Sequence, residues 1–220
     1  MMSSGKDASG PETERIADLL ADRASSSCAA LSDQAGLKVT ARVDQDELIR
    51  ANAVAGRTFG NQWAVVVSRG ALEAIAPLRA PDQALDLLIA HEIGHVAARD
   101  IGPPIALIRG FIILMVLEAA CVWAAISNAS LLPLCAGIAI AFAAWAWATF
   151  FGAWRSRKRE FSADRFAARL TGYGDRLGEL LDALQRHEHP SPIKTSRLMR
   201  LMTGHPSISE RVHRLSSPVS

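Results

Sequence analysis

The longest charge-free stretch of the chain constrains its fold most. From Ala119 to Trp154 there is no Asp, Glu, Lys or Arg in 36 positions. As one helix this stretch would be about 54 Å long, whereas a hydrocarbon core is about 30 Å thick. Two spans fit better, over Ile105–Ile126 and Leu131–Trp154, joined by the turn SNAS. The pattern therefore predicts a transmembrane helical hairpin.

Charges at the ends of the hairpin indicate its orientation. The second span ends in RSRKR (Arg155–Arg159), whereas the connecting turn is uncharged. The positive-inside rule then places the basic end in the cytosol. We expect a multi-pass protein of the cell (inner) membrane, in contact with the lipid bilayer and with the segments that flank the hairpin on the cytoplasmic side. A hairpin inserted into a partner protein is the alternative.

One acid conflicts with this scheme. Glu118 falls near the middle of the first span, where a charge costs about 2.5–3.5 kcal/mol on insertion scales. A protonated side chain, a side chain that faces the bundle interior and a shallow hairpin are all compatible with the sequence.

Composition excludes several classes of protein. Half of the residues are hydrophobic and the net charge is +2, so no basic field indicates a nucleic-acid partner. The three cysteines form no CxxC pair, which argues against a disulfide framework or a thiolate zinc site. The N-terminus has no apolar core after its charges and does not resemble a signal peptide.

Outside the hairpin the pattern is mainly helical with two predicted strands. An amphipathic helix is predicted over Glu12–Leu31. A second helix is predicted from Pro81 to Asp100, and four further helical segments follow the hairpin. Strands are predicted over Leu37–Val43 and within Asn61–Leu72, after the turn-like AGRTFGN. The four segments after the hairpin are REFSADRFAARL, Asp175–His187, Ser191–Met202 and the residues that follow His205-Pro206.

We divide the chain accordingly into four parts. Residues 1–11 form a disordered N-terminus, and residues 12–104 hold the first helix, a small sheet and the helix ending near Asp100. Residues 105–154 form two transmembrane helices, and residues 155–220 form a C-terminal helical part.

The strongest chemical signal is the HEIGH motif at residues 91–95, within LLIAHEIGHVAARD. His91 and His95 are i and i+4 on the predicted helix, so both imidazoles project from one face and can share a metal ion. Glu92 lies one step round the helix, where it can reach a metal-bound water and remove its proton. The apolar flanks penalise unpaired polar groups, which favours metal ligation over a pair of surface histidines.

A third protein ligand is needed for a catalytic zinc site. If the hairpin crosses the membrane twice, the chain returns to the side of the HEIGH helix. Glu160 and Asp164 are i and i+4 on the returning helix, so one can bind the metal while the other orients a histidine. The same spacing also fits two solvent-exposed acids of a charged helix surface. Further candidates for the third ligand are the other acids and four histidines: His187, His189, His205 and His213.

Taken together, these motifs resemble the M48 family of membrane zinc metalloproteases, of the HtpX and Ste24 type. The resemblance covers about Leu37 to Leu215. Four elements match in order: NAVAG before the second strand, LIAHEIGHVAARD, REFSADRFAARLTG after the hydrophobic hairpin, and HPSISERVHRL near the end.

The resemblance implies a set of site residues. His91, His95 and Glu160 would bind one Zn²⁺ per chain, with Glu92 as the general base. Asp164 would be the supporting acid. His205 and Arg211 fall on the late element, where they would stabilise the oxyanion or brace the site.

The resemblance also implies a substrate-binding strand. In zincin proteases an edge strand binds extended substrate backbone to backbone. By analogy that strand is WAVVVS, with Val65 and Val66, and its approach would be shaped by Asn52 and Gly56. A core strand and a plain turn are the alternative interpretations.

The predicted fold is mainly α with a small β-sheet, a zincin-like metalloprotease domain interrupted by a transmembrane helical hairpin. Heat-shock members of the family usually carry a further pair of spans, so a single hairpin disfavours an enclosed chamber and a prenylated substrate. We expect a zinc endopeptidase with its catalytic side cytoplasmic, which acts on membrane or unfolded proteins or peptides. We expect no nucleic-acid partner, and the sequence leaves the oligomeric state undetermined. A non-catalytic, zinc-stabilised membrane scaffold is the alternative.

Overall fold

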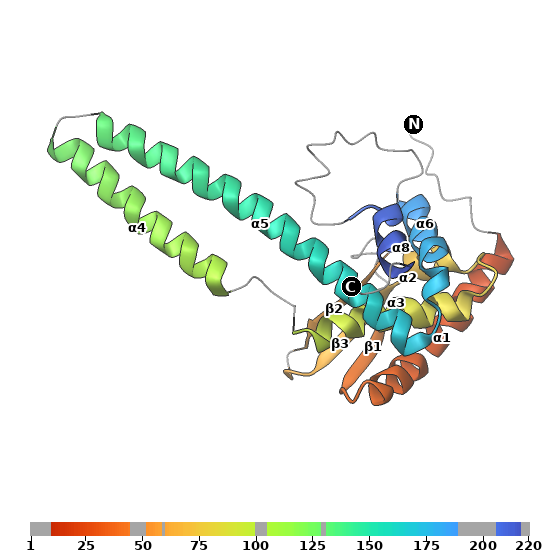
Figure 1. The fold of residues 1–220 in the computed structure, drawn as a ribbon. Helices are drawn as coiled ribbons and strands as arrows, with labels where there is room; N and C mark the ends of the chain where they lie inside the picture. The colour runs from red at the N-terminus through yellow and green to blue at the C-terminus, as the bar shows by residue number, and fades with distance from the viewer. Residues whose placement is uncertain are drawn as a thin grey trace, which may run out of the picture. The chain divides into compact units, whose positions relative to one another are not determined.

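The computed structural model describes residues 10–44, 52–58, 60–99, 105–128, 131–188 and 206–216. Within them the chain is mainly helical with one three-stranded sheet, and the expected fold class is confirmed (Figure 1). Contacts divide it into two compact units. The first contains Met1–Ile101, Lys158–Lys194 and Pro206–Ser220, and the second contains Gly102–Arg157 and Thr195–His205. The helix predicted over Ser191–Met202 lies outside the described residues.

The first unit begins with helix α1, Pro11–Gln34. Proline stands in its first turn and two glutamates follow, which suits the positive end of the helix dipole. Gly36 adopts a φ of +67° after its last turn, the left-handed conformation that commonly ends a helix. The buried residues recur at helical spacing and face the core: Ala17, Leu20, Ala24, Cys28 and Leu31.

The sheet contains strands β1 (Val39–Asp44), β2 (Ala53–Arg57) and β3 (Trp63–Ser68). Its order is β1-β3-β2, with β1 parallel and β2 antiparallel to β3. Strands lie where Leu37–Val43 and Asn61–Leu72 predicted them. By contrast β2, which includes Gly56, was expected to be a turn.

This strand order corrects the predicted substrate strand. β3 carries Val65 and Val66, and it pairs with a neighbour on both sides. Its backbone groups are therefore used within the sheet and cannot pair with an added peptide. The edge strands are β1 and β2.

Two helices follow the sheet: α2 (Arg69–Ile75) and α3 (Pro81–Ala97). Ser68 ends β3 and also caps α2, because its side chain accepts a hydrogen bond from the Ala71 N–H. Apolar side chains of α1, α2, α3 and one face of the sheet form a single core. α3 is buried around most of its circumference, which fixes the rotation of the helix that carries the HEIGH motif.

The last elements of the first unit are helical. Helix α5, Leu132–Thr171, contributes its residues from Lys158 onward, and it ends before Gly172, whose φ is +77°. A 3-10 turn (η1, Gly174–Arg176) leads into α6, Leu177–Glu188. Helix α8, Ile208–Ser216, contacts α6.

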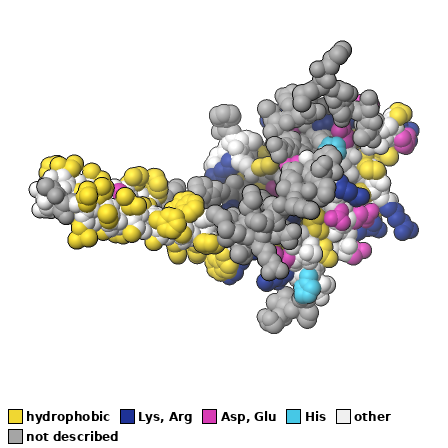
Figure 2. Space-filling model, turned by 90° about the horizontal axis from the view of Figure 1, so that it is seen from above, with side chains coloured by type: hydrophobic (Ala, Val, Ile, Leu, Met, Phe, Trp, Pro, Cys, Tyr) yellow, Lys and Arg dark blue, Asp and Glu magenta, His cyan; other side chains and the backbone are white. Residues whose placement is uncertain are grey.

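The second unit is the helical hairpin of α4 (Ile105–Ser127) and the first part of α5. Both helices are long and apolar enough to cross a membrane, and almost none of the residues in their most apolar segments is buried. Hydrophobic side chains cover the visible face of the hairpin (Figure 2). A core helix of a soluble protein would instead be buried.

Within the hairpin, Glu118 faces the other helix. A Cβ added at Gly137 of α5 would lie 3.1 Å from the Glu118 Oε2 atom and 3.0 Å from the Cys121 Cβ. Glycine at this position therefore makes room for the carboxyl group between the helices. Of the three options that the sequence left open, the structure favours the side chain that faces the bundle interior.

Candidate metal centre

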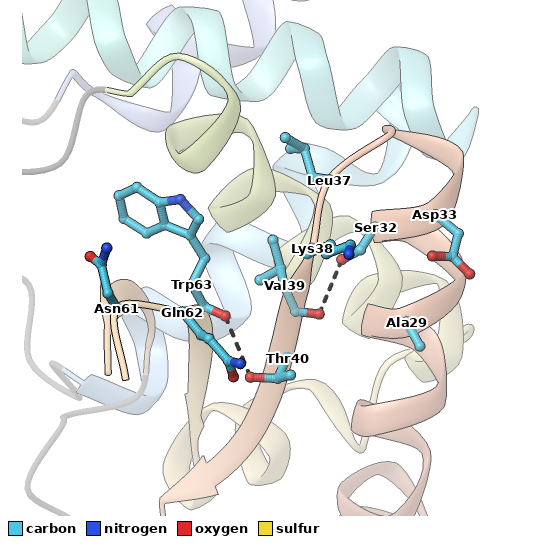
Figure 3. Close-up of a pocket in the computed structure, with 10 residues that line it drawn as sticks. All are labelled: Ala29, Ser32, Asp33, Leu37, Lys38, Val39, Thr40, Asn61, Gln62 and Trp63. Carbon is cyan, nitrogen blue, oxygen red and sulfur yellow. Dashed lines mark hydrogen bonds between the residues drawn. The ribbon is translucent and has the colours of Figure 1, made fainter. Parts of the chain in front are cut away.

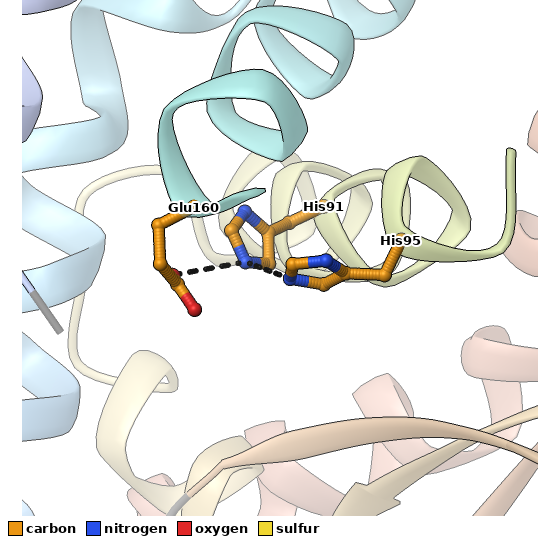
Figure 4. A group of neighbouring side chains, drawn as sticks. All are labelled: His91, His95 and Glu160. Atoms are coloured by element: carbon orange, nitrogen blue, oxygen red, sulfur yellow. Dashed lines mark hydrogen bonds and ion pairs between the residues drawn. The ribbon is translucent and has the colours of Figure 1, made fainter. Parts of the chain in front are cut away.

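Three potential metal ligands converge where α3 passes α5 (Figure 4). The Nε2 atoms of His91 and His95 are 3.2 Å apart, and the Glu160 Oε2 atom is 3.6 Å from His91 Nε2. One ligand atom from each residue lies within 4.8 Å of the other two. The histidines come from α3 and the glutamate from α5, so this contact between helices assembles the cluster.

Gly94 allows the two helices to approach closely at this point. A Cβ at Gly94 would lie 3.1 Å from the Ala163 Cα atom and 3.2 Å from the Phe166 ring. The first of these neighbours is backbone and cannot move without shifting α5. The absence of a side chain at Gly94 therefore allows the short distance between α3 and α5 at the cluster.

We expect the substitution Gly94→Ala to weaken both folding and metal binding. Overpacking of this kind costs about 1–3 kcal/mol, and separation of the helices moves Glu160 away from the histidines. Thermal unfolding in detergent and zinc competition with a chelator measure the two effects. Gly152→Ala is the matched control, because a Cβ there meets nothing within 4 Å; equal behaviour of the two variants would contradict the prediction.

Asp164 holds the other side of His91. Its Oδ1 atom lies 3.0 Å from His91 Nδ1, within the distance of an ion pair. Arg211 of α8 binds the same carboxylate with two donors, and the Nε to Oδ2 distance is 2.8 Å. Arg211 Nη1 also lies 3.3 Å from Glu160 Oε2. Arg211 therefore braces both acids of α5.

Burial and charge oppose each other in this cluster. Asp164 is only 1% exposed. Burial raises its pKa, but the hydrogen bonds from Arg211 and the close contact with His91 outweigh burial and lower the pKa. Burial lowers the pKa of His91, whereas Asp164 and Glu160 raise it, and the result is a pKa of about 9. The acids thus stabilise positive charge at the point where the ligand atoms meet.

Glu92 is held by the backbone of β2. Its Oε2 atom accepts a hydrogen bond of 2.8 Å from the Ala55 N–H. Burial raises the pKa of Glu92 to about 7, although nearby His91 and the Ala55 amide oppose the rise. A carboxyl group with this pKa can exchange a proton near neutral pH.

The chemistry of the donors fits zinc. Two imidazole nitrogens and one carboxylate oxygen form a borderline ligand set of the kind that zinc prefers. His91 presents Nε2 to the cluster while Nδ1 faces Asp164, as expected for a histidine ligand oriented by an acid. Among the described residues, no other group of three such side chains is close enough to share an ion.

The structure brings together most of the predicted site residues. His91, Glu92, His95, Glu160, Asp164 and Arg211 lie in one cluster, and His205 lies outside the described residues. Asn52 is exposed and its Oδ1 atom accepts the Ala53 N–H at the start of β2, whereas Gly56 lies within β2. The amide of Ala55 was missed, because a backbone group leaves no signal in a sequence.

A separate cavity of about 550 Å³ lies at the end of the sheet where β1 and β3 begin (Figure 3). None of the cluster residues lines it. Its walls come from the end of α1 and the starts of β1 and β3: Ala29, Ser32, Asp33, Leu37, Lys38, Val39, Thr40, Asn61, Gln62 and Trp63.

Comparison with known proteins identifies relatives of this chain. Residues 12–219 match the sequence profile of peptidase family M48. Protease HtpX of Ectopseudomonas mendocina is 30% identical over 210 residues, which cover 84% of this chain and 69% of that protein. Protease HtpX of Pseudomonas fluorescens Pf-5 is also 30% identical over 210 residues, with 84% and 68% covered.

A solved structure shares the fold. The crystal structure of S. mikatae Ste24p superposes with a TM-score of 0.62 at 16% identity. The match covers 88% of this chain and 50% of that one, so the chain spans half the length of this structural relative. The profile match over residues 12–219 and the identity to the two HtpX proteases agree with this likeness. The chain therefore belongs to peptidase family M48, a family of metal-dependent proteases.

Proposed function

We propose that this chain is a membrane-anchored, zinc-dependent endopeptidase that cleaves membrane or unfolded proteins at the cytosolic face. One observation carries the proposal: His91, His95 and Glu160 converge within 4.8 Å. Glu92 follows His91 on the same helix and is buried beside them. This constellation suits hydrolysis by activated water, and membership of a protease family agrees with it.

Each residue has a distinct role in this proposal. His91 and His95, through Nε2, and Glu160 would hold one Zn²⁺ per chain. When bound, zinc supplies Lewis acidity that makes water a stronger acid and polarises the peptide carbonyl. Glu92 takes the proton of the attacking water and later gives it to the leaving amine. Asp164 orients His91, and Arg211 holds Asp164.

The edge of β2 offers a place for the substrate backbone. Because the Ala55 N–H points to Glu92 rather than to β3, the backbone groups of alternate residues of β2 face outward. The outward N–H groups of Ala53 and Ala55 bind Asn52 and Glu92, so a peptide would pair with this edge mainly by donating its own N–H groups to the outward carbonyls. A peptide that paired with this edge would run past Glu92. The docking strand is thus β2 rather than the predicted β3.

Zinc content and proteolysis test the proposal together. Purified in detergent, the full chain should hold about one zinc ion and digest casein. A chelator should abolish digestion, and added zinc should restore it. Zinc-loaded chain that cleaves neither casein nor a random peptide library would exclude the proposed activity.

Membrane anchoring predicts resistance to alkaline extraction. The chain should stay in the membrane pellet after carbonate treatment, because the exposed apolar face of the hairpin needs lipid. The substitution Phe142→Arg should weaken insertion by about 2.5–3.5 kcal/mol, because the exposed Phe142 lies near the middle of the second span. Leu19→Arg is the matched control, since Leu19 is an exposed apolar residue of α1 outside the hairpin. Release of the unmodified chain into the soluble fraction would contradict the anchoring.

A further inference from the structure

Arg57, at the end of β2, carries an exposed guanidinium group that lies over the ring of Trp63 in β3, two residues from Ala55 on the proposed docking strand. It lies two residues beyond Ala55, a distance of about 7 Å along a strand. Residues i and i+2 of a strand share a face and point their amides the same way. The side chain of Arg57 therefore lies on the same face as that of Ala55, beside any peptide that pairs with the outer edge of β2.

The guanidinium is held by its neighbours. Arg57 pairs with Trp63 across β2 and β3, and its guanidinium carbon lies 4.5 Å from the centre of the Trp63 ring. Its Nη1 atom donates to Asn61 Oδ1 in the turn between these strands. Arg57 is exposed, and no carboxylate of the described residues pairs with it. The stacked ring limits its motion and leaves donors available for an acidic partner.

We infer that Arg57 selects substrates with an acidic side chain two or three residues upstream of the scissile bond. The inference rests on the proposed function. The attacked carbonyl must lie beside Glu92, which is bonded to Ala55, so one of the two residues that flank the scissile bond lies opposite Ala55. In an antiparallel pairing, the more stable kind, the residue opposite Arg57 comes two positions earlier in the substrate. Side chains of directly opposed residues share a face, and opposite charges there attract.

A random peptide library measures the preference at many cleavage sites in one experiment. The full chain in detergent, loaded with zinc, is incubated with the library, and cleavage positions are read by mass spectrometry. Asp and Glu should be enriched at the second or third upstream position. In matched peptides that differ only there, Asp should raise kcat/KM over Asn by up to about fivefold, mainly through KM, and salt should reduce the ratio.

Charge reversal at Arg57 provides the strictest test. The Arg57→Glu variant should prefer Lys to Asp at the same position. The Arg42→Glu variant, which changes an arginine of the other edge strand β1, should keep the preference for acid. If Arg57→Glu cleaves no peptide, the unmodified chain provides the test instead. Its ratio of kcat/KM for the Asp peptide to kcat/KM for the Asn peptide should fall as salt is added, and a ratio that does not change with salt overturns the inference.

The remaining outcomes separate this inference from the proposed function. Cleavage of all peptides with no acidic preference overturns the role of Arg57 and leaves the protease intact. An acidic preference downstream of the scissile bond overturns the antiparallel docking. A zinc-loaded chain that cleaves no peptide overturns the proposed function and this inference with it.

Discussion

Replacement of Glu92 by Gln should reduce proteolysis by about 10²–10⁴-fold, the usual contribution of a general base, while zinc stays bound. Gln keeps the shape of the side chain, and its amide oxygen can still accept the Ala55 N–H that now binds Glu92. The ligands His91, His95 and Glu160 are unchanged. The variant therefore loses proton transfer alone.

Zinc content and casein digestion of the purified variant provide the measurement. Glu179→Gln is the matched control, because Glu179 is an exposed acid of α6 whose partner Arg176 lies 3.7 Å away. The activity of this control should stay within about twofold of the parent chain. A Glu92→Gln variant that binds zinc and cleaves as fast as the parent chain would exclude Glu92 as the base. If the parent chain and the variant bind zinc and neither cleaves, the non-catalytic scaffold is the better description.

The helical part of the site was predictable because helix geometry is local. Spacing of four residues places His91 above His95 and Glu160 above Asp164 on their helices, whatever the rest of the chain does. The two helices lie in contact as expected from a hairpin that returns the chain to the side it left. The apolar period of α1 was equally visible, and α3 was indicated by Pro81-Asp82 at its start.

Long-range features of the site could not be predicted from these patterns. β2 reads as a turn because it is short and contains glycine; it is a strand because β3 pairs with it, a tertiary effect on propensity. The amide of Ala55 bonds Glu92 across 37 positions of sequence, and any residue except proline could supply that amide. The part played by Arg211 depends on where α8 docks, and local spacing does not determine that.

The pairing of Asp164 with Arg211 leads to the second large expected effect. Asp164 is 1% exposed, and it accepts two hydrogen bonds from Arg211. In Asp164→Leu the Arg211 charge is buried with its main partner removed. Loss of one member of a buried ion pair costs about 3–5 kcal/mol, so the free energy of unfolding should fall by this amount. Zinc affinity should fall about 10–100-fold as His91 loses the acid that orients it.

A double-mutant cycle separates the ion pair from simple loss of packing. Arg211→Met keeps most of the length of the side chain and removes the charge, so Asp164→Leu combined with Arg211→Met leaves no unpaired arginine. The double variant should be more stable than Asp164→Leu alone, with a coupling of about 1–3 kcal/mol between the sites. Denaturant unfolding in detergent measures stability, and chelator competition measures zinc affinity. Zinc affinity should stay low in the double variant, because Asp164 is still absent beside His91. Additive losses of stability would mean that Arg211 and Asp164 act independently, contrary to the geometry of their contact.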